Sequence, residues 1–494
     1  MKASLNLYNL IKSLTKSEKR YFNLNYLQKS DDKNYGKLFK EIELQSVKVK
    51  YDEEEIKRKF KNELFIKQLT FTKNYLHNLI VKSLISFYSK NNLESELYNL
   101  ILASKIFFKK SLFDDYFIAL EKAKILAERT EKFGTLIEVI KQQMKLVRLK
   151  SRKKYKRRNL YNEEQEAIKK IENISAYSKL LNTFYSITKI PDYARSKILY
   201  KEALKIFDNK LLSSEKYALS ETAKDLYYLL LLYKNELLEN NAALFEISGK
   251  RYESYRRNKD VFKSDPEDKD LSLSYNLLHY SLIAGKIIFF NSAIKEFEYK
   301  FINEKNLAVQ SESNYFYLQL LSELYYKQNK MKECLSFADK VFDYLRSDEA
   351  IQNKDELLSY YFTYAKINFE CKNYLKALEV LGIIITHEYK DVRYDILSYA
   401  HFLELFIHYE LKNYQLVSSY IRSLTRKLSI HKEKDLSEKI ILNFFSELIS
   451  ENKIDEEYVL KKYYKKFQLL KKNKYERVFY NELPIDKWIA KKIS

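Results

Sequence analysis

Histidine, glutamate and cysteine side chains that could bind a metal or carry out catalysis are few in this chain of 494 residues. His401, Glu404 and His408 are separated by three and four positions, so they share one face of a helix and have the chemistry of metal ligands. No second cluster supplies further ligands, and the repeat pattern described below assigns all three to inward packing positions. We therefore predict that the chain holds neither a metal nor a cofactor.

Signatures of nucleophilic catalysis and of nucleotide binding are missing from the sequence. It contains no Gly-x-Ser-x-Gly elbow and no dinucleotide or Walker fingerprint. The two cysteines, Cys334 and Cys371, have no histidine at a recognisable motif spacing and are too few for a disulfide framework. We predict that the protein is not an enzyme and that it resides in a reducing compartment.

Residues 65–80 have features of a DNA-binding helix-turn-helix, with apolar and capping residues near the positions that this motif uses. The side chains that would face the major groove are Lys73, Asn74, His77 and Asn78. Thr70 stands at the turn, where glycine is usual, and the bulky Tyr75 stands where a small residue is usual. The alternative is one continuous helix of an N-terminal bundle. A helix break near Thr70 would distinguish the two.

Positive charge is concentrated in residues 148–158, which contain eight basic residues in eleven and no acid. A phosphate-binding strip there would use Arg152, Lys153, Lys154, Arg157 and Arg158. A solvated helix end or loop is the alternative. The net charge of +22 also suits an anionic partner, but Lys supplies 73 of the 89 basic residues and Arg, the preferred phosphate reader, only 16. Nucleic acid is therefore a secondary candidate for the partner.

The elements that position these residues are predicted to be helices, because only 5 glycines and 3 prolines interrupt the chain. Residues 1–92 form a first helical domain. Thr15 and Glu18 make a capping box, and Asp52 begins a helix that continues almost without interruption to Ser89.

Helical hairpins with a spacing of about 40 residues follow from residue 93 to residue 450, which predicts an α-solenoid. The clear copies cover residues 100–123, 317–341, 361–381 and 401–424. The breaks predicted between them are Pro191, Gly249 and residues 263–268. Residues 451–494 complete the all-α fold as a basic helical cap, with a short helix after Pro484 that carries the only tryptophan, Trp488.

The hairpins resemble divergent tetratricopeptide repeats (TPR). The positions that carry the resemblance in one copy are Leu318, Leu321, Ser322, Tyr325, Cys334, Ala338 and Val341. Tyr361, Tyr364, Ala365, Ala377, Leu381 and Ile384 carry it in the next. The chain ends also resemble an uncharacterised family of Bacteroidetes-type helical-repeat proteins, in residues 7–22, 65–69, 73–76, 82–84 and 488–489. That second resemblance implies no established activity.

Helical repeats of this kind predict a scaffold that binds a protein or peptide segment along its concave face. The contacts are expected one position past the packing residues of each first helix, at Gln319, Tyr326, Phe362, Phe369, Phe402 and Tyr409. The alternative is a DNA-binding regulator that reads DNA with residues 65–80 and uses the solenoid as a sensor. No apolar stretch approaches the roughly 18 residues of a membrane span, so we predict a cytoplasmic protein without a membrane partner.

Overall fold

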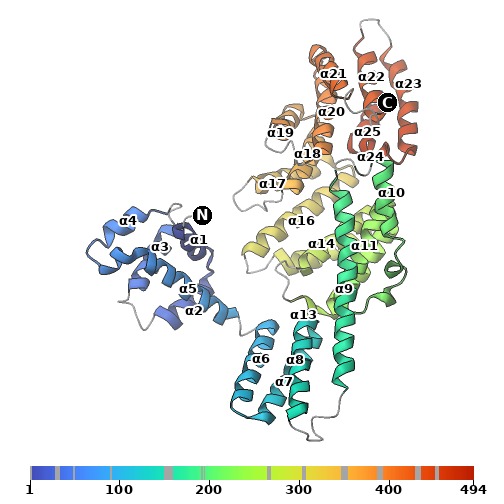
Figure 1. Ribbon diagram of the computed structural model, residues 1–494. Coiled ribbons are helices and arrows are strands. Elements are labelled where there is room, and N and C mark those ends of the chain that lie inside the picture. Colours follow the sequence, from blue (N-terminus) through green and yellow to red (C-terminus); the bar gives the residue numbers. More distant parts are fainter. Residues whose placement is uncertain are drawn as a thin grey trace. The chain divides into compact units, whose positions relative to one another are not determined.

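The computed structural model describes residues 3–27, 34–47, 51–88, 92–149, 159–190, 193, 195–263, 269–302, 307–346, 354–386, 393–428, 436–450 and 455–493. These residues form an all-α fold, with no strand in any of the described ranges (Figure 1). The chain divides into two compact units, Met1–Ala167 and Ile168–Ser494. The predicted fold class is confirmed: helices stack as hairpins into a solenoid-like array.

The first part of unit 1 is a small helical bundle. Its elements are α1 (Ala3–Ser13), α2 (Lys16–Phe22) with a π-helical turn (Asn23–Leu27), α3 (Asn34–Val47), α4 (Glu53–Lys59), a 3-10 turn (Leu64–Gln68) and α5 (Leu69–Tyr88). Ile11, Phe39, Ile42 and Leu76 are fully buried at its centre. Each helix has one apolar face, and the helices bury these faces against one another to form the core.

Two of the predicted helix starts are confirmed. The Thr15 backbone N–H donates to Glu18 Oε2 at 2.6 Å, and the Glu18 N–H donates to Thr15 Oγ1 at 3.3 Å, which completes the capping box of α2. Asp52 Oδ1 accepts from the N–H groups of Glu54 and Glu55 and so caps α4.

The helical pattern predicted almost without interruption from Asp52 to Ser89 is interrupted in the described residues, because the chain turns between α4 and α5. Helix α4 ends at Lys59, and the ring of the next residue, Phe60, lies 5.5 Å from the ring of the buried Phe65. A straight helix would place side chains five positions apart on different sides, so the turn is what brings both aromatic rings to the core.

The second part of unit 1 contains α6 (Leu93–Lys109), α7 (Phe113–Arg129) and α8 (Phe133–Leu149), which pack in chain order. The hairpin predicted at residues 100–123 is confirmed as α6 and α7. Helix α9 (Leu160–Thr188) begins in unit 1 and continues in unit 2. The compact units divide between Ala167 and Ile168, and the boundary that the sequence suggested at residue 92 stays a prediction.

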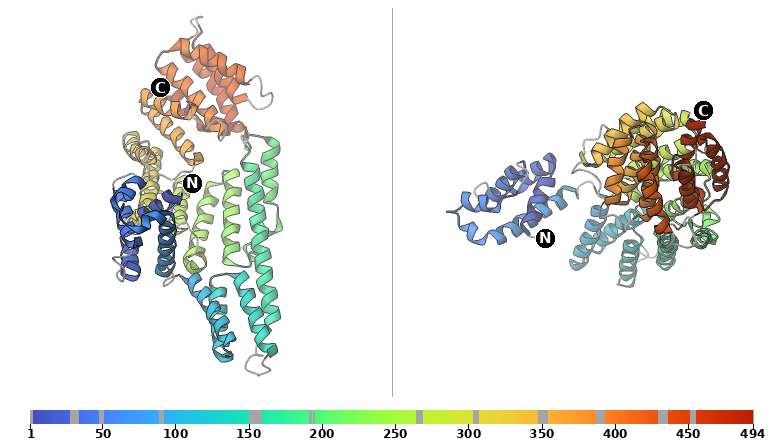
Figure 2. Two further views of the ribbon diagram at one scale, coloured as in Figure 1. Left: turned by 60° about the vertical axis from the view of Figure 1, so that its left-hand side comes forward. Right: turned by 90° about the horizontal axis from the view of Figure 1, so that it is seen from above.

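Unit 2 is built mainly from helical hairpins that contact one another in chain order (Figures 1 and 2). After α10 (Lys197–Ile206), the hairpins are α11 (Glu221–Leu237) with α12 (Asn241–Arg257), α14 (Lys269–Ile283) with α15 (Ile287–Phe297), α16 (Leu307–Lys327) with α17 (Met331–Leu345), α18 (Lys354–Glu370) with α19 (Tyr374–Thr386), and α20 (Tyr394–Glu410) with α21 (Tyr414–Leu428). The one-turn helix α13 (Lys259–Phe262) and a π-helical turn (Glu298–Ile302) lie between them. The three later hairpins are those that the sequence predicted.

The turn of each hairpin in unit 2 contains one residue in the left-handed region. These residues are Glu239, Gly285, Asn329, Lys372 and Lys412, which follow one another at intervals of 40 to 46 residues. Only one is glycine, so the chain accepts the cost of a left-handed side chain at the others. This explains how so many hairpins form with so few glycines. Gly249, predicted as a break, instead lies inside α12, where packing against α14 outweighs its weak helix propensity.

The C-terminal helices are α22 (Leu436–Leu448), α23 (Glu456–Lys472), α24 (Arg477–Glu482) and α25 (Ile485–Ile493). The short helix predicted after Pro484 is confirmed as α25. These helices meet the beginning of unit 2, because Arg195 Nη2 lies 2.6 Å from Glu438 Oε2 and 3.6 Å from Glu476 Oε2. The Arg195 guanidinium also lies 4.9 Å from the centre of the Phe479 ring. A buried ion-pair cluster therefore joins segments that are 243 residues apart.

Candidate functional site

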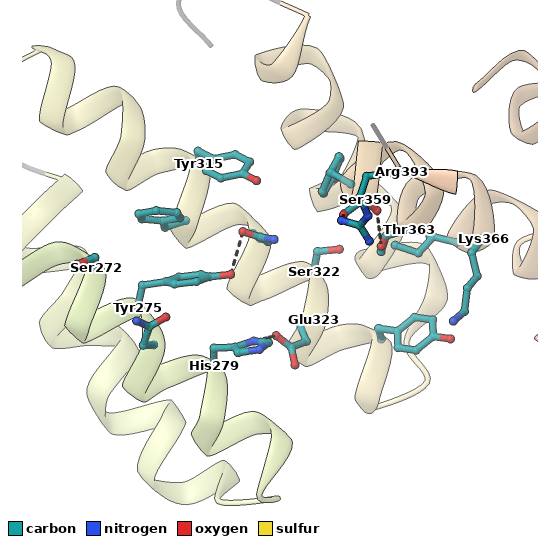
Figure 3. Close-up of a pocket in the computed structure, with 16 residues that line it drawn as sticks. Ser272, Tyr275, His279, Tyr315, Ser322, Glu323, Ser359, Thr363, Lys366 and Arg393 are labelled. Carbon is teal, nitrogen blue, oxygen red and sulfur yellow. Dashed lines mark hydrogen bonds and ion pairs between the residues drawn. The ribbon is translucent and has the colours of Figure 1, made fainter. Parts of the chain in front are cut away.

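A cavity of about 600 Å³ lies on one face of unit 2, among the first helices of three successive hairpins (Figure 3). We call the face formed by α14, α16, α18 and α20 the first-helix face. The cavity is lined by Ser272, Tyr275, Asn276 and His279 of α14, by Tyr315, Phe316, Gln319, Ser322, Glu323 and Tyr326 of α16, by Ser359, Tyr360, Thr363, Lys366 and Ile367 of α18, and by Arg393. A volume of this size suits a small ligand or part of a peptide.

The wall between α14 and α16 is an aromatic and polar surface made by equivalent positions of two hairpins. The rings of Tyr275 and Phe316 are stacked with their centres 4.4 Å apart. Tyr275 Oη donates to Gln319 Oε1 at 3.0 Å, and His279 Nδ1 lies 2.7 Å from Glu323 Oε2 (Figure 3). Both polar pairs join residues 44 positions apart, because one hairpin repeat brings the same helix position alongside itself.

The opposite wall, formed by α18 and Arg393, carries positive charge. Arg393 Nε and Nη2 hold Asp395 in a two-pronged ion pair at 2.8 and 2.7 Å, while Nη1 donates to Ser359 Oγ at 3.4 Å. Lys366 is half-buried, and no hydrogen bond or ion pair joins its Nζ to any residue that the structure describes. Burial lowers the pKa of the Lys366 ammonium; Glu482 and Glu370 oppose that shift, and Lys487 adds to it.

Helix α25 borders the cavity at Tyr326. The Tyr326 hydroxyl donates to Glu370 Oε1 at 2.6 Å, and burial together with that carboxylate raises the pKa of the phenol. Lys487 of α25 reaches Glu370 Oε2 at 2.9 Å, and its Nζ lies 3.8 Å from the centre of the Tyr326 ring. The cavity therefore ends where the chain's own C-terminal helix begins to cover the first-helix face.

Gln319 and Tyr326, two of the six residues predicted to contact a partner, line the cavity. The other four, Phe362, Phe369, Phe402 and Tyr409, are buried. The Phe402 ring packs against Phe479 of α24, and the Tyr409 ring against Trp488 of α25. In the described structure these helices cover the part of the face to which Phe402 and Tyr409 belong. Partner contact by all six stays a prediction.

Sequence reasoning identified the C-terminal segment as a cap but missed what it binds. Trp488 Nε1 donates to Glu410 Oε1 at 2.9 Å, and Lys492 Nζ lies 2.9 Å from the same oxygen. Glu410 occupies the position in α20 that Glu370 occupies in α18, and both are followed by Lys-Asn-Tyr after one residue. That repeated glutamate, opposite a helix rich in lysine, was the available signal.

The residues predicted to face DNA do not form one exposed surface. Lys73 is buried, lies 2.6 Å from Glu53 and has its Nζ over the Tyr51 ring. Asn74 and Asn78 are exposed, and His77 is partly buried. Thr70 lies in the first turn of α5, so the helix does not break at Thr70 itself. The chain turns just before it, because residues 64–68 form a 3-10 turn, and the single continuous helix over residues 65–80 that was the alternative is therefore wrong.

Arg152, Lys153, Lys154, Arg157 and Arg158 fall outside the described residues.

His401 Nδ1 lies 3.4 Å from Glu404 Oε2, whereas His408 packs on the ring of Tyr420. Burial lowers the pKa of His408, and the Glu404 carboxylate, which favours the charged ring, offsets that shift only in part. In the described ranges no three histidine, cysteine or carboxylate side chains are grouped as metal ligands.

No family model, curated protein or solved structure matches this chain. Within the described residues, every helix is too short or too polar to cross a lipid bilayer.

Proposed function

We propose that this protein is a non-enzymatic, cytoplasmic scaffold that binds a segment of another protein, and that the segment enters the cavity of the first-helix face. The main support for the proposal is the cavity itself, which is surrounded by residues of α14, α16 and α18. Its size and its mixture of aromatic and polar side chains are typical of ligand sites.

The chemistry of the lining suits a peptide. Tyr275 and Phe316 offer a stacked apolar platform, and tyrosines bind with little loss of side-chain entropy. Gln319, Ser359 and Thr363 add hydroxyl and amide groups that can pair with a peptide backbone. A cavity with this lining can therefore bind a segment through both its side chains and its main chain.

A second observation supports the same conclusion. The neighbouring part of the first-helix face already holds α25, a segment of the chain itself, through Trp488 and Lys487. The face thus has the shape and the carboxylates needed to hold a basic, aromatic segment. Helix α25 leaves the part lined by α14, α16 and α18 open as a cavity, and a different segment can bind there.

The test is selection from random-peptide libraries on the full-length protein. Thr363 lines the cavity and is exposed, so Thr363→Trp fills the cavity without burying new bulk in the core. The matched control is Ser336→Trp, at an exposed position of α17 that does not line the cavity. We expect selected peptides to lose at least about tenfold in affinity on Thr363→Trp, since a blocked pocket removes more than about 1.4 kcal/mol, and to bind Ser336→Trp unchanged.

Selection of no peptide by the wild type, or equal binding to both variants, would contradict the proposal. The DNA-binding alternative has weaker support, because Lys73, one of the four side chains that it requires, is buried and engaged by Glu53.

A further inference from the structure

We propose that the segment bound in the cavity presents a carboxylate to Lys366, so that the ligand class is an acidic peptide. The inference rests on the proposed function, because it names the chemistry of the ligand for the same cavity. It depends on the charges that face the cavity and on which of them are already paired.

The charges of the lining leave one cation unmatched. The Glu323 carboxylate is hydrogen-bonded to the His279 ring at 2.7 Å, and of the two cations of the lining Arg393 is held by Asp395 at 2.8 and 2.7 Å. Lys366 Nζ has no such partner among the described residues. A half-buried cation without a partner has lost part of its hydration and gained no ion pair, so an anion that enters the cavity recovers that loss.

Two carboxylates, Glu482 and Glu370, interact electrostatically with the Lys366 ammonium and favour its charged form. Glu370 is already bound by Lys487 at 2.9 Å and by the Tyr326 hydroxyl at 2.6 Å. Glu482 is exposed on α24 and forms no ion pair with Lys366. Lys487, the other nearby cation, is occupied by Glu370. The arrangement leaves Lys366 as the group that an incoming anion would meet.

The other wall of the cavity defines the rest of the ligand. The stacked rings of Tyr275 and Phe316 face the same volume from α14 and α16, and they suit an aromatic or aliphatic side chain. The ligand is therefore an acidic group close to an apolar one. A lysine binds carboxylate as a point charge, so either an Asp or Glu side chain or a peptide C-terminus can provide the anion.

Two random-peptide libraries separate these sources, one with the peptide C-terminus fused to its carrier and one with it free. We expect the full-length wild type to enrich Asp or Glu from the fused library, or the free C-terminus from the other. Lys366→Glu should reverse the preference to Lys or Arg, and Lys366→Met should abolish it. Lys327→Glu, at an exposed position of α16 outside the cavity, is the matched charge control.

Affinities of one selected peptide and its Glu→Gln or C-terminally amidated form then give the size of the effect. The wild type and Lys366→Arg should prefer the carboxylate about tenfold or more, and Lys366→Met should not discriminate. Enrichment of peptides without a carboxylate preference, with binding still blocked by Thr363→Trp, would overturn this inference and leave the proposed function standing. Selection of no peptide at all would overturn both.

Discussion

The ion pair between Arg195 and Glu438 allows a quantitative test of how unit 2 is closed. Arg195 side-chain exposure is 6% and that of Glu438 is 3%, and the two residues are 243 positions apart. The perturbations are Arg195→Met, which keeps the length of the side chain and removes its charge, and Glu438→Gln, which removes the charge of the partner.

The two changes should differ in cost. Removing one partner of a buried ion pair destabilises a protein by about 3–5 kcal/mol, because the other charge stays buried without compensation. Arg195→Met leaves two carboxylates, Glu438 and Glu476, and removes the contact with the Phe479 ring, so we expect the upper end of that range. Glu438→Gln leaves Arg195 with Glu476 at 3.6 Å, so we expect about 3 kcal/mol.

The assay is urea denaturation of the full chain, followed by the fluorescence of Trp488. This is the only tryptophan, it is 6% exposed, and it lies in α25, so its signal reports on unit 2. The double variant Arg195→Met/Glu438→Gln should cost clearly less than the sum of the single variants, because it removes both charges of the Arg195–Glu438 pair and leaves only the Glu476 carboxylate, which Ser437 still binds.

A loss of less than about 1 kcal/mol in Arg195→Met would refute the reasoning, since that is the cost of a surface pair. If the costs of the two substitutions simply added in the double variant, Arg195 and Glu438 would not interact. The two ends of unit 2 would then not meet at this ion pair.

Four further predictions concern other parts of the chain. Asp225→Asn should destabilise unit 2 by about 3–5 kcal/mol in the same urea assay, because the largely buried Asp225, with 12% of its side chain exposed, holds both Arg251 and Lys269; a change below about 1 kcal/mol would argue against a cluster shielded from solvent. Lys412→Gly should raise the thermal midpoint, because a non-glycine residue in the left-handed region costs about 1–2 kcal/mol, whereas Lys340→Gly at an exposed position in the middle of α17 should lower it. Ala377→Leu should cost about 1–3 kcal/mol by overpacking the contact of α18 with α19, and an unchanged midpoint would mean that the site is not closely packed. Burial raises the pKa of Glu18, but hydrogen bonds from Tyr88 and Thr15 outweigh burial and hold the pKa below its usual value. Tyr88→Phe should therefore raise the pKa of Glu18 in an NMR titration. The stability that ionised Glu18 contributes is present above its unfolded pKa near 4.5 and is lost as the pH falls through the folded pKa.

The sequence predicted the hairpins where periodicity and turn chemistry agreed. Residues 361–381 show this, since Lys372 and Asn373 end one helix and start the next at the predicted place. The hairpin of α11 and α12 was missed as a clear copy, because Gly249 reads as a break until the packing of α12 on α14 is known. Local signals thus identify helices, and packing decides which glycine interrupts one.

The cavity could be anticipated only in part. Gln319 and Tyr326 were placed correctly on the first-helix face, because their helix register follows from the repeat. Lys366 and Arg393 were missed, since each is an ordinary basic residue in a chain that contains 89. The burial of Phe402 and Tyr409 was missed for a different reason: it depends on α24 and α25, which fold back over a part of the chain that the sequence does not connect to them.

The central claim, that the cavity of the first-helix face binds a peptide, is tested most directly by hydrogen exchange of the full-length protein with and without a selected peptide. The proposal predicts slower exchange in residues 272–279, 315–326 and 359–367, which line the cavity, and unchanged exchange in α1–α5 and α23. Protection confined to α23 or to unit 1, or no protection at saturating peptide, would contradict it.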